Sequence, residues 1–338
     1  MNIKQSELLK LEHLDVSALK TRDVPLLPVW RDGDWHMWFL TGDACLQKMQ
    51  IHDIASGEYL SNGDAARSDD LGFELLNLFN QYFSYASLRS FSSALADDFG
   101  NLAVHAAKID HLFYNRNLID PVLLSSFIST EIEGMLVNIR STFDLTQEIM
   151  SRFWNDHVQL IDLHSNALKK QNKLPGTFRK VIESSGKLRS KPDIIAKYLL
   201  PADVANEYVR HSEFFMRLRA NRDSIVHGTK GVNHIFVDER GFAVNPCDEL
   251  FSKFIWKDFH YLNANLVSLR PWLADIILSA MQACTDLIGS FGKCIQLDDK
   301  IFPGYKVFLR HSANPALATL LTAASVDRGV AEPAVFWN

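Results

Sequence analysis

The stretch that most constrains the fold of this chain is a long amphipathic helix pattern in residues 201–228. Positions separated by four and three residues share one helix face, and they are Val204, Tyr208, His211, Phe215, Leu218, Arg222 and Ile225. This face begins apolar and ends charged. Gly228 is the residue type that most often ends a helix in a left-handed conformation, so we expect the helix to end there, with His227 in its last turn.

The polar end of this helix carries Arg222, Asp223 and His227. A histidine in the last turn meets the negative end of the helix dipole, which favours its protonated form. Arg222 lies five residues before His227, so the two side chains diverge on a regular helix. They converge only at an irregular helix end or across a dimer.

The segment from Arg222 to His227 resembles the signature of HEPN domains, in which an arginine is followed by four to six residues and a histidine. HEPN domains are all-helical modules found in RNA-cleaving toxins and antiviral defence proteins. The resemblance implies a metal-independent endoribonuclease without a cofactor, assembled as a homodimer. It makes His227 the acid/base residue and Arg222 the phosphate-binding residue. Asp223 takes the position after the arginine, which is polar in many members, and is our third catalytic candidate.

The bare spacing occurs three times, in residues 31–36, 152–157 and 222–227. The first match lies in a Gly/Asp-rich stretch that is typical of a turn, and the second has an aromatic residue after its arginine. Only the third follows a long amphipathic helix and precedes a glycine. A structural alternative stays open, in which Arg219, Asp223 and His227, each four residues apart, form an exposed ladder of ion pairs.

Composition is typical of a globular protein, with 47% hydrophobic and 22% charged residues in 338. The four cysteines form no CxxC pair, which argues against a zinc ribbon and a disulfide scaffold and suits a reducing compartment. The N-terminal sequence lacks a signal-peptide pattern, and no apolar run of about eighteen residues occurs, so we expect a cytoplasmic protein. A net charge of -5 argues against a constitutive, sequence-independent DNA binder.

Residues 169–191 are locally basic, with eight lysines and arginines and one acidic residue. A basic segment just upstream of the motif could hold a nucleic-acid backbone. Our candidates for RNA binding are therefore Lys169, Lys170, Arg179, Lys180 and, on the motif helix, Arg219. The alternative is a solvated and partly mobile connection, because prolines, glycines and serines also gather in this segment.

We expect a mainly α fold in three segments. Residues 1–118 are an α+β accessory region, residues 119–295 a HEPN-like helical bundle with a small β-hairpin insertion, and residues 296–338 a tail packed on the body. A few short strands or irregular turns are expected between residues 29 and 60, and helices over 71–85, 91–114, 121–153, 246–266 and 273–291. The hairpin is expected at 235–244. Asp70 should cap the first of these helices, Pro271 should break the fourth, and Gly292 should end the fifth.

Two further functions stay open beside the ribonuclease. One is a non-catalytic HEPN-like module that binds a protein partner or a nucleotide. The other is a helical enzyme unrelated to HEPN, with its pocket among the aromatic helices of the first segment. The sequence contains no dinucleotide-binding, HExxH, GxSxG or kinase motif. An enzyme built from this chain must therefore use scattered residues or the pair of Arg222 and His227.

Overall fold

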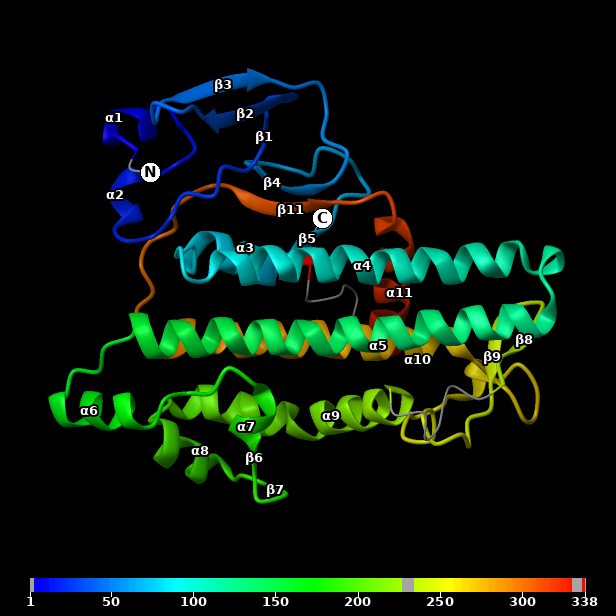
Figure 1. Cartoon of the computed structure of the whole chain (residues 1–338). Helices are drawn as coiled ribbons and strands as arrows, with labels where there is room; N and C mark the ends of the chain where they lie inside the picture. Colours follow the sequence, from blue (N-terminus) through cyan, green and yellow to red (C-terminus); the bar gives the residue numbers. More distant parts are fainter. Residues whose placement is uncertain (1–2, 227–233, 330–335, 338) are drawn as a thin grey trace.

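The structure is a computed structural model, and it describes residues 3–226, 234–329 and 336–337, with the side chains of 222–226 and 336–337 outside the description. Helices take up about 53% of the chain and strands 13%, which confirms the expected mainly α class. Figure 1 shows a small sheet formed mainly by N-terminal strands lying above a stack of long helices. A group of short helices lies along the far side of that stack.

The N-terminal sheet has five strands in the order β11-β4-β1-β2-β3. The first four strands fall where the sequence predicts them, and they are β1 (Val29–Arg31), β2 (Asp34–Leu40), β3 (Leu46–Gln50) and β4 (Gly57–Ser61). Two short helices precede them, α1 (Gln5–Leu8) and α2 (Val16–Leu19). The fifth strand, β11 (Lys306–Arg310), comes from the C-terminal tail and pairs with β4 in antiparallel register. The tail therefore completes the sheet.

A single buried glutamine fixes the tail on α3 (Glu74–Tyr82). The amide nitrogen of Gln81 donates to the carbonyl oxygens of Phe302 (3.0 Å) and Tyr305 (2.9 Å). Its amide oxygen accepts from the backbone nitrogen of Phe302 at 3.0 Å. The two bonds to Phe302 are buried and the bond to Tyr305 is partly buried, and an unmade hydrogen bond in the interior is costly, so these bonds help to define the register of the tail.

Four long helices form the body below the sheet (Figure 1). They are α4 (Arg89–Tyr114), α5 (Pro121–Arg152), α9 (Ala202–Val226) and α10 (Leu269–Cys294). The start of α5 follows from its sequence, because the Asp120 carboxylate accepts from the backbone nitrogens of Val122 (3.0 Å) and Leu123 (3.1 Å). Helix α5 packs against α4, α9 and α10, and α9 packs against α10. Helix α11 (Asn314–Asp327) packs on α4 and α10.

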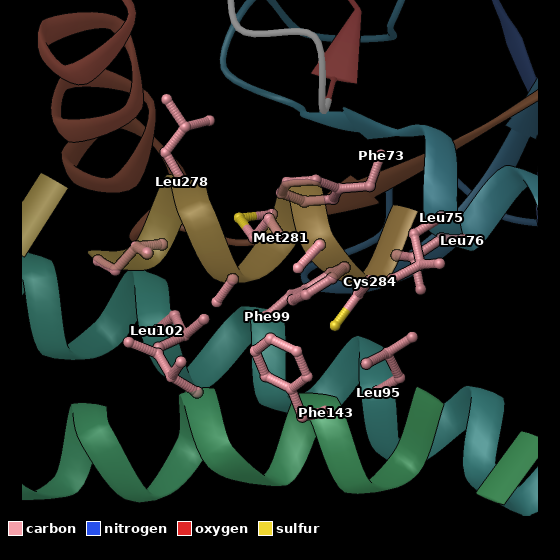
Figure 2. Close-up of a cluster of buried hydrophobic side chains, with 14 of the residues drawn as sticks. Phe73, Leu75, Leu76, Leu95, Phe99, Leu102, Phe143, Leu278, Met281 and Cys284 are labelled. Carbon is pink, nitrogen blue, oxygen red and sulfur yellow. The ribbon is translucent and has the colours of Figure 1, made fainter. Parts of the chain in front are cut away.

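The core lies between the sheet and the helices and continues among the helices. Figure 2 shows Phe73 of β5 (Gly72–Phe73), Phe99 of α4, Phe143 of α5 and Cys284 of α10 in one buried cluster. This cluster extends from Leu11 near the N-terminus to Ala324 in α11, so it draws on all three segments expected from the sequence. The division at residues 118 and 295 stays a prediction.

Helix α5 and the π-helical turn η2 (Phe153–His157) after it form the one described helix that is long and apolar enough to cross a membrane. Ile128, Ile132 and Ile139 of α5 are completely buried. Burial of the apolar stripe in this way is typical of a core helix in a soluble protein. The cytoplasmic location stays a prediction.

The helix expected over 246–266 is wrong. This segment forms turns, a single turn of 3-10 helix η3 (Asp258–His260) and strand β10 (Val267–Ser268), which pairs with β9. Asparagine side chains cause the difference. Asn245 accepts from the nitrogen of Cys247 at 2.9 Å, and Asn263 accepts from those of Asn265 and Leu266 at 3.0 Å each. Such local bonds compete with a helix. The four long helices of the body therefore include α4, which lies in the segment predicted as the accessory region.

Three predicted boundaries are also wrong. Helix α10 starts at Leu269, so Pro271 lies in its first turn, where no backbone N–H is needed, and the helix passes Gly292 to end at Cys294. Asp70 caps no helix, because it is buried and accepts from Arg310. The predicted hairpin is confirmed, with β8 (Phe236–Asp238) and β9 (Gly241–Val244) antiparallel.

Candidate functional site

Helix α9 confirms the apolar face that the sequence predicts. Val204, Tyr208 and Phe215 are completely buried, and Leu218 is 1% exposed. Arg222 and Asp223 continue the helical backbone to its last described residue, Val226, but their side chains lie outside the described residues. His227 lies outside them altogether. The catalytic assignments to these three residues therefore stay predictions.

A cavity of about 520 Å³ adjoins the last described turns of α9. Helix α9 contributes Arg217, Leu218 and Asn221 to its wall. The irregular segment after the hairpin, the first turns of α10 and the last turn of α11 close the other sides. Asn221 directly precedes Arg222, so the cavity lies next to the predicted catalytic residues along the helix. Its volume falls in the range of small-molecule sites.

Four basic and two acidic side chains line this cavity, and they differ in how they are paired. Arg328 forms an ion pair with Asp275, and Lys257 lies 3.5 Å from the carboxylate of Asp327. Arg217 and Lys253 are exposed, and neither has a carboxylate partner among the described residues. The wall therefore offers positive charge that the described part of the chain does not neutralise.

The acidic wall residue Asp327 is held in place by a buried histidine. His260 is 2% exposed, and its Nε2 lies 2.8 Å from the Asp327 carboxylate. The backbone nitrogen of Lys257 donates to His260 Nδ1 at 3.1 Å. Nδ1 is thus an acceptor and Nε2 carries the hydrogen, which assigns the tautomer from the hydrogen bonds. Both ring nitrogens are occupied, so His260 positions Asp327 and is not free for proton transfer.

Aromatic side chains form the apolar part of the wall. Trp272 is 5% exposed and packs edge-on against Phe251 with ring centroids 5.0 Å apart. Phe254 packs edge-on against Trp256 at 4.6 Å. These contacts fix the rings that face the cavity, namely Trp272 and Phe254. Aromatic side chains beside unneutralised cations suit a ligand with an apolar ring and an anionic group.

Two other cavities differ from this one in the charged residues that line them. One of about 770 Å³ lies between α4, α5 and residues 311–313, and its carboxylate, Glu131, is bound by His105 (2.6 Å) and Lys108 (3.2 Å). Another of about 330 Å³ lies at η2 and has no lysine or arginine in its wall. There His157 stacks on Tyr85, with 3.8 Å between ring centroids, and burial lowers the pKa of His157.

Lys169 does not offer its charge to the surface, which corrects its assignment to RNA binding. Its side chain is 4% exposed, and its Nζ donates to the carbonyl oxygen of Val158 at 2.6 Å. The ammonium also lies 5.0 Å from the ring centroid of Trp154. Burial lowers the pKa of Lys169. The neighbouring Lys170 is exposed. On α6 (Leu163–Gln171), Lys169 is therefore a core residue and the next residue, Lys170, is a surface residue.

The rest of the basic segment is folded rather than a loose connection. Helix α7 (Phe178–Ile182) buries Phe178 against Phe215 of α9, with ring centroids 4.6 Å apart. The segment continues with β6 (Glu183–Ser184), β7 (Lys187–Leu188) and α8 (Lys191–Tyr198). This packing holds the basic segment against the motif helix.

The remaining RNA-binding candidates keep some surface exposure. Arg179 donates two hydrogen bonds to Glu183, at 2.8 and 3.0 Å. That bond, more than the charges of Arg179 and Arg219, lowers the pKa of Glu183. Arg219 is half-buried, and Lys180 is exposed. Both arginines therefore lie within the field of one carboxylate.

Sequence reasoning missed Arg217, Lys253 and Asp327. Arg217 stands off the predicted apolar face, and the other two come from segments predicted as a helix and as a tail. Comparison of the chain with models of known families, with curated proteins and with solved structures finds no match.

Proposed function

We propose that this chain is a metal-independent endoribonuclease of the HEPN type that acts at the C-terminal end of α9. The observation that supports the proposal is the cavity beside Asn221, with its aromatic wall and the two cations Arg217 and Lys253. The proposal treats the packing of α5, α9 and α10 as a HEPN-like bundle.

The chemistry follows from the three predicted catalytic residues. An imidazole with a pKa near 6.5 exchanges protons near neutral pH, so His227 takes the proton of a ribose 2′-hydroxyl or gives one to the leaving oxygen. Arg222 supplies a permanent charge for the phosphate as negative charge grows in the transition state. Asp223 assists as a polar neighbour. The products carry a 2′,3′-cyclic phosphate, and no metal takes part.

The cavity supplies binding beside the chemistry. A base fits against Trp272 and Phe254, while Arg217 and Lys253 hold a phosphate of the same strand. Lys170, Arg179, Lys180 and Arg219 extend the positive surface along α6, α7 and α9 for the rest of the RNA backbone. Lys169 has no part in this surface.

The proposed enzyme is a cytoplasmic homodimer in a toxin or antiviral defence system. Arg222 and His227 are five residues apart, so their side chains point in different directions on a regular helix. In a homodimer, Arg222 of one subunit can lie beside His227 of the other. RNA is the proposed substrate, and a protein partner such as an inhibitor fits the same setting.

The test is cleavage of mixed RNA in EDTA. Wild-type protein is compared with His227→Ala, Arg222→Ala and, as a control, His164→Ala, which removes an exposed histidine of α6. We expect His227→Ala to lose about 10²–10⁴-fold in rate, the usual contribution of a general acid or base. The control should keep full activity. Equal cleavage by all four proteins rejects the proposal.

The alternative is a non-catalytic module that binds a nucleotide or a protein partner. The cavity favours it to the same degree as the ribonuclease, because its size and its aromatic and cationic wall already suit one nucleotide. Tight binding of a mononucleotide that is lost in Arg217→Ala, together with intact RNA after long incubation, supports this alternative. A stable complex in a pull-down supports the protein-binding form of it.

A further inference from the structure

Three metal-ligating side chains converge between α9 and α10, away from the cavity. Glu207 and His211 are four residues apart and share one face of α9. The packing of α10 brings Asp286 to the same point, so that one ligand atom of each residue lies within 4.8 Å of the others. All three side chains are largely buried, with 11%, 13% and 23% of their surface exposed for Glu207, His211 and Asp286.

The distances between these atoms suit a small metal ion. His211 Nε2 lies 3.2 Å from the carboxylate of Asp286 and 3.5 Å from that of Glu207. Tetrahedral zinc with bonds of about 2.0–2.1 Å holds its ligand atoms roughly 3.3 Å apart. One imidazole nitrogen and two carboxylate oxygens are also ligand types that zinc accepts. The two separations that involve His211 are therefore close to those of zinc ligands, and the third is at most 4.8 Å.

A guanidinium group occupies this point in the structure. Arg210 Nη2 lies 2.6 Å from Glu207 and contacts the same oxygen of Asp286 that faces His211. It also lies 3.1 Å from His211 Nε2. Three groups that can each donate an electron pair thus face one positive charge. The side chain of Arg210 is 50% exposed, so it can leave for solvent without disturbing the core.

The ion pair with Arg210 is the one short contact of a buried carboxylate oxygen of Glu207. Glu207 is 8% exposed, and its Oε2 makes no hydrogen bond of acceptable geometry, although the ion pair with Arg210 is short. A buried carboxylate must be paired with a cation or bound to a metal ion, so a metal ion can take the place of Arg210 at this oxygen. This oxygen points to the same centre as His211 and Asp286.

We propose that Glu207, His211 and Asp286 bind a divalent transition-metal ion, with zinc as the best fit, and that Arg210 is the cation it displaces. The fourth coordination position opens to solvent on the side from which Arg210 withdraws. Gln282 holds Asp286 from behind, through a hydrogen bond of 2.9 Å to the other carboxylate oxygen. The ion links α9 to α10.

This site is separate from the proposed ribonuclease centre. His211 precedes Asn221 by ten residues, which corresponds to roughly 15 Å along a helix. The ion therefore fixes the two helices that border the cavity and takes no part in RNA cleavage. The inference does not depend on the proposed function, and each can fail without the other.

The test is zinc binding by the full chain after treatment with a chelator. Calorimetry with zinc chloride should give one site per chain, and cobalt chloride should give the visible absorption of a tetrahedral ion. We expect His211→Ala and Asp286→Asn each to weaken zinc binding by more than the roughly 10–100-fold caused by loss of an outer-shell partner. His164→Ala, which removes an exposed histidine, should bind as the wild type does.

Arg210→Ala separates a metal site from a plain ion-pair network. Removing the competing charge should tighten zinc binding by about fivefold, which corresponds to one or two surface ion pairs. Zinc should also raise the melting temperature of this variant. Unchanged or weaker zinc binding by Arg210→Ala overturns the proposal, and so does binding that survives both His211→Ala and Asp286→Asn.

Discussion

Two regions of this molecule place basic side chains beside aromatic rings, and they treat the charge in opposite ways. In the N-terminal sheet, Arg310 is 3% exposed and lies 5.0 Å from the ring of Trp35 and 5.6 Å from that of Tyr59. Its guanidinium donates to Asp70 at 2.7 and 3.0 Å and also contacts Asp53. All of these partners of Arg310 are side chains of the protein itself.

The cavity beside α9 has the same ingredients, but among the described residues only two of its four cations, Arg328 and Lys257, have a carboxylate partner. Arg217 and Lys253 stand near Phe254 and Trp272, and no described carboxylate neutralises them. A buried charge must be paired, whereas an exposed one is left free at little cost. The comparison teaches that Arg310 stabilises the fold, while the exposed cavity residues Arg217 and Lys253 can bind a ligand.

The largest expected effect is that of Arg310→Ala. It leaves the carboxylate of Asp70, 2% exposed, without its cation. Breaking a buried pair in this way costs about 3–5 kcal/mol of unfolding free energy. Urea denaturation measures the loss. The control is Arg67→Ala, which removes the half-exposed partner of Asp53 and should cost less than about 1 kcal/mol. Equal losses in the two variants contradict the comparison.

The adjacent lysines Lys169 and Lys170 of α6 allow a second comparison between a buried and an exposed cation. Lys169→Met leaves the carbonyl of Val158 without its donor, so we expect a loss of about 1–3 kcal/mol in unfolding free energy. Lys170→Met should leave stability unchanged, because that side chain is exposed. Denaturation curves of the two variants measure the change in unfolding free energy of each. Stable Lys169→Met protein means that the buried bond contributes nothing.

Glu58 of β4 shows the reverse case, a carboxylate desolvated by the fold. Burial raises the pKa of Glu58 to about 7, although a hydrogen bond from Asn80 (3.1 Å) opposes the shift. The folded state thus holds its proton more tightly than the unfolded state, whose pKa is 4.5. The stabilisation of the folded state by protonated Glu58 is fully present below pH 4.5 and is lost as the pH rises through 7.

The variant Glu58→Gln should remove that pH dependence. At pH 8 it should be about 1–2 kcal/mol more stable than the wild type, a value reduced for the partial exposure of the residue. Below pH 4.5 the two proteins should have the same stability. Thermal unfolding across this range measures the difference, and parallel curves for the two proteins argue against a raised pKa.

The smallest effect on stability is expected at the cavity. Arg217→Ala and Lys253→Ala should each change the unfolding free energy by less than about 0.5 kcal/mol. Each should weaken RNA binding about fivefold and lower the slope of log affinity against log salt by about 1. Filter binding at several salt concentrations measures both quantities. A stable variant with an unchanged salt slope removes that residue from the binding surface.

The long helices of this fold were predictable because their apolar residues repeat at helical spacing over many turns. Helix α9 illustrates it, since Val204, Tyr208 and Phe215 are all buried as the pattern requires. The hairpin at residues 236–244 was predictable for a similar reason, from two short apolar runs joined by a turn with Gly241.

The cavity was not predictable, because its walls depend on contacts between distant segments. Lys253 lies in a stretch whose Leu250 and Phe254 suggest a helix, while asparagine side chains at 245 and 263 fold it into turns. Asp327 reaches the wall only because α11 packs on α10. The pairing of β11 with β4 and the bond between Arg310 and Asp70 join residues more than 200 positions apart, beyond any local pattern.

The most direct test of the central claim is the rate of RNA cleavage in EDTA by wild-type protein, His227→Ala and the double variant Arg217→Ala/Lys253→Ala. If the cavity binds the strand next to the reacting residues, His227→Ala loses kcat, and the double variant raises KM while keeping most of kcat. If all three proteins cleave with the same kcat and KM, the end of α9 and its cavity are not the functional site.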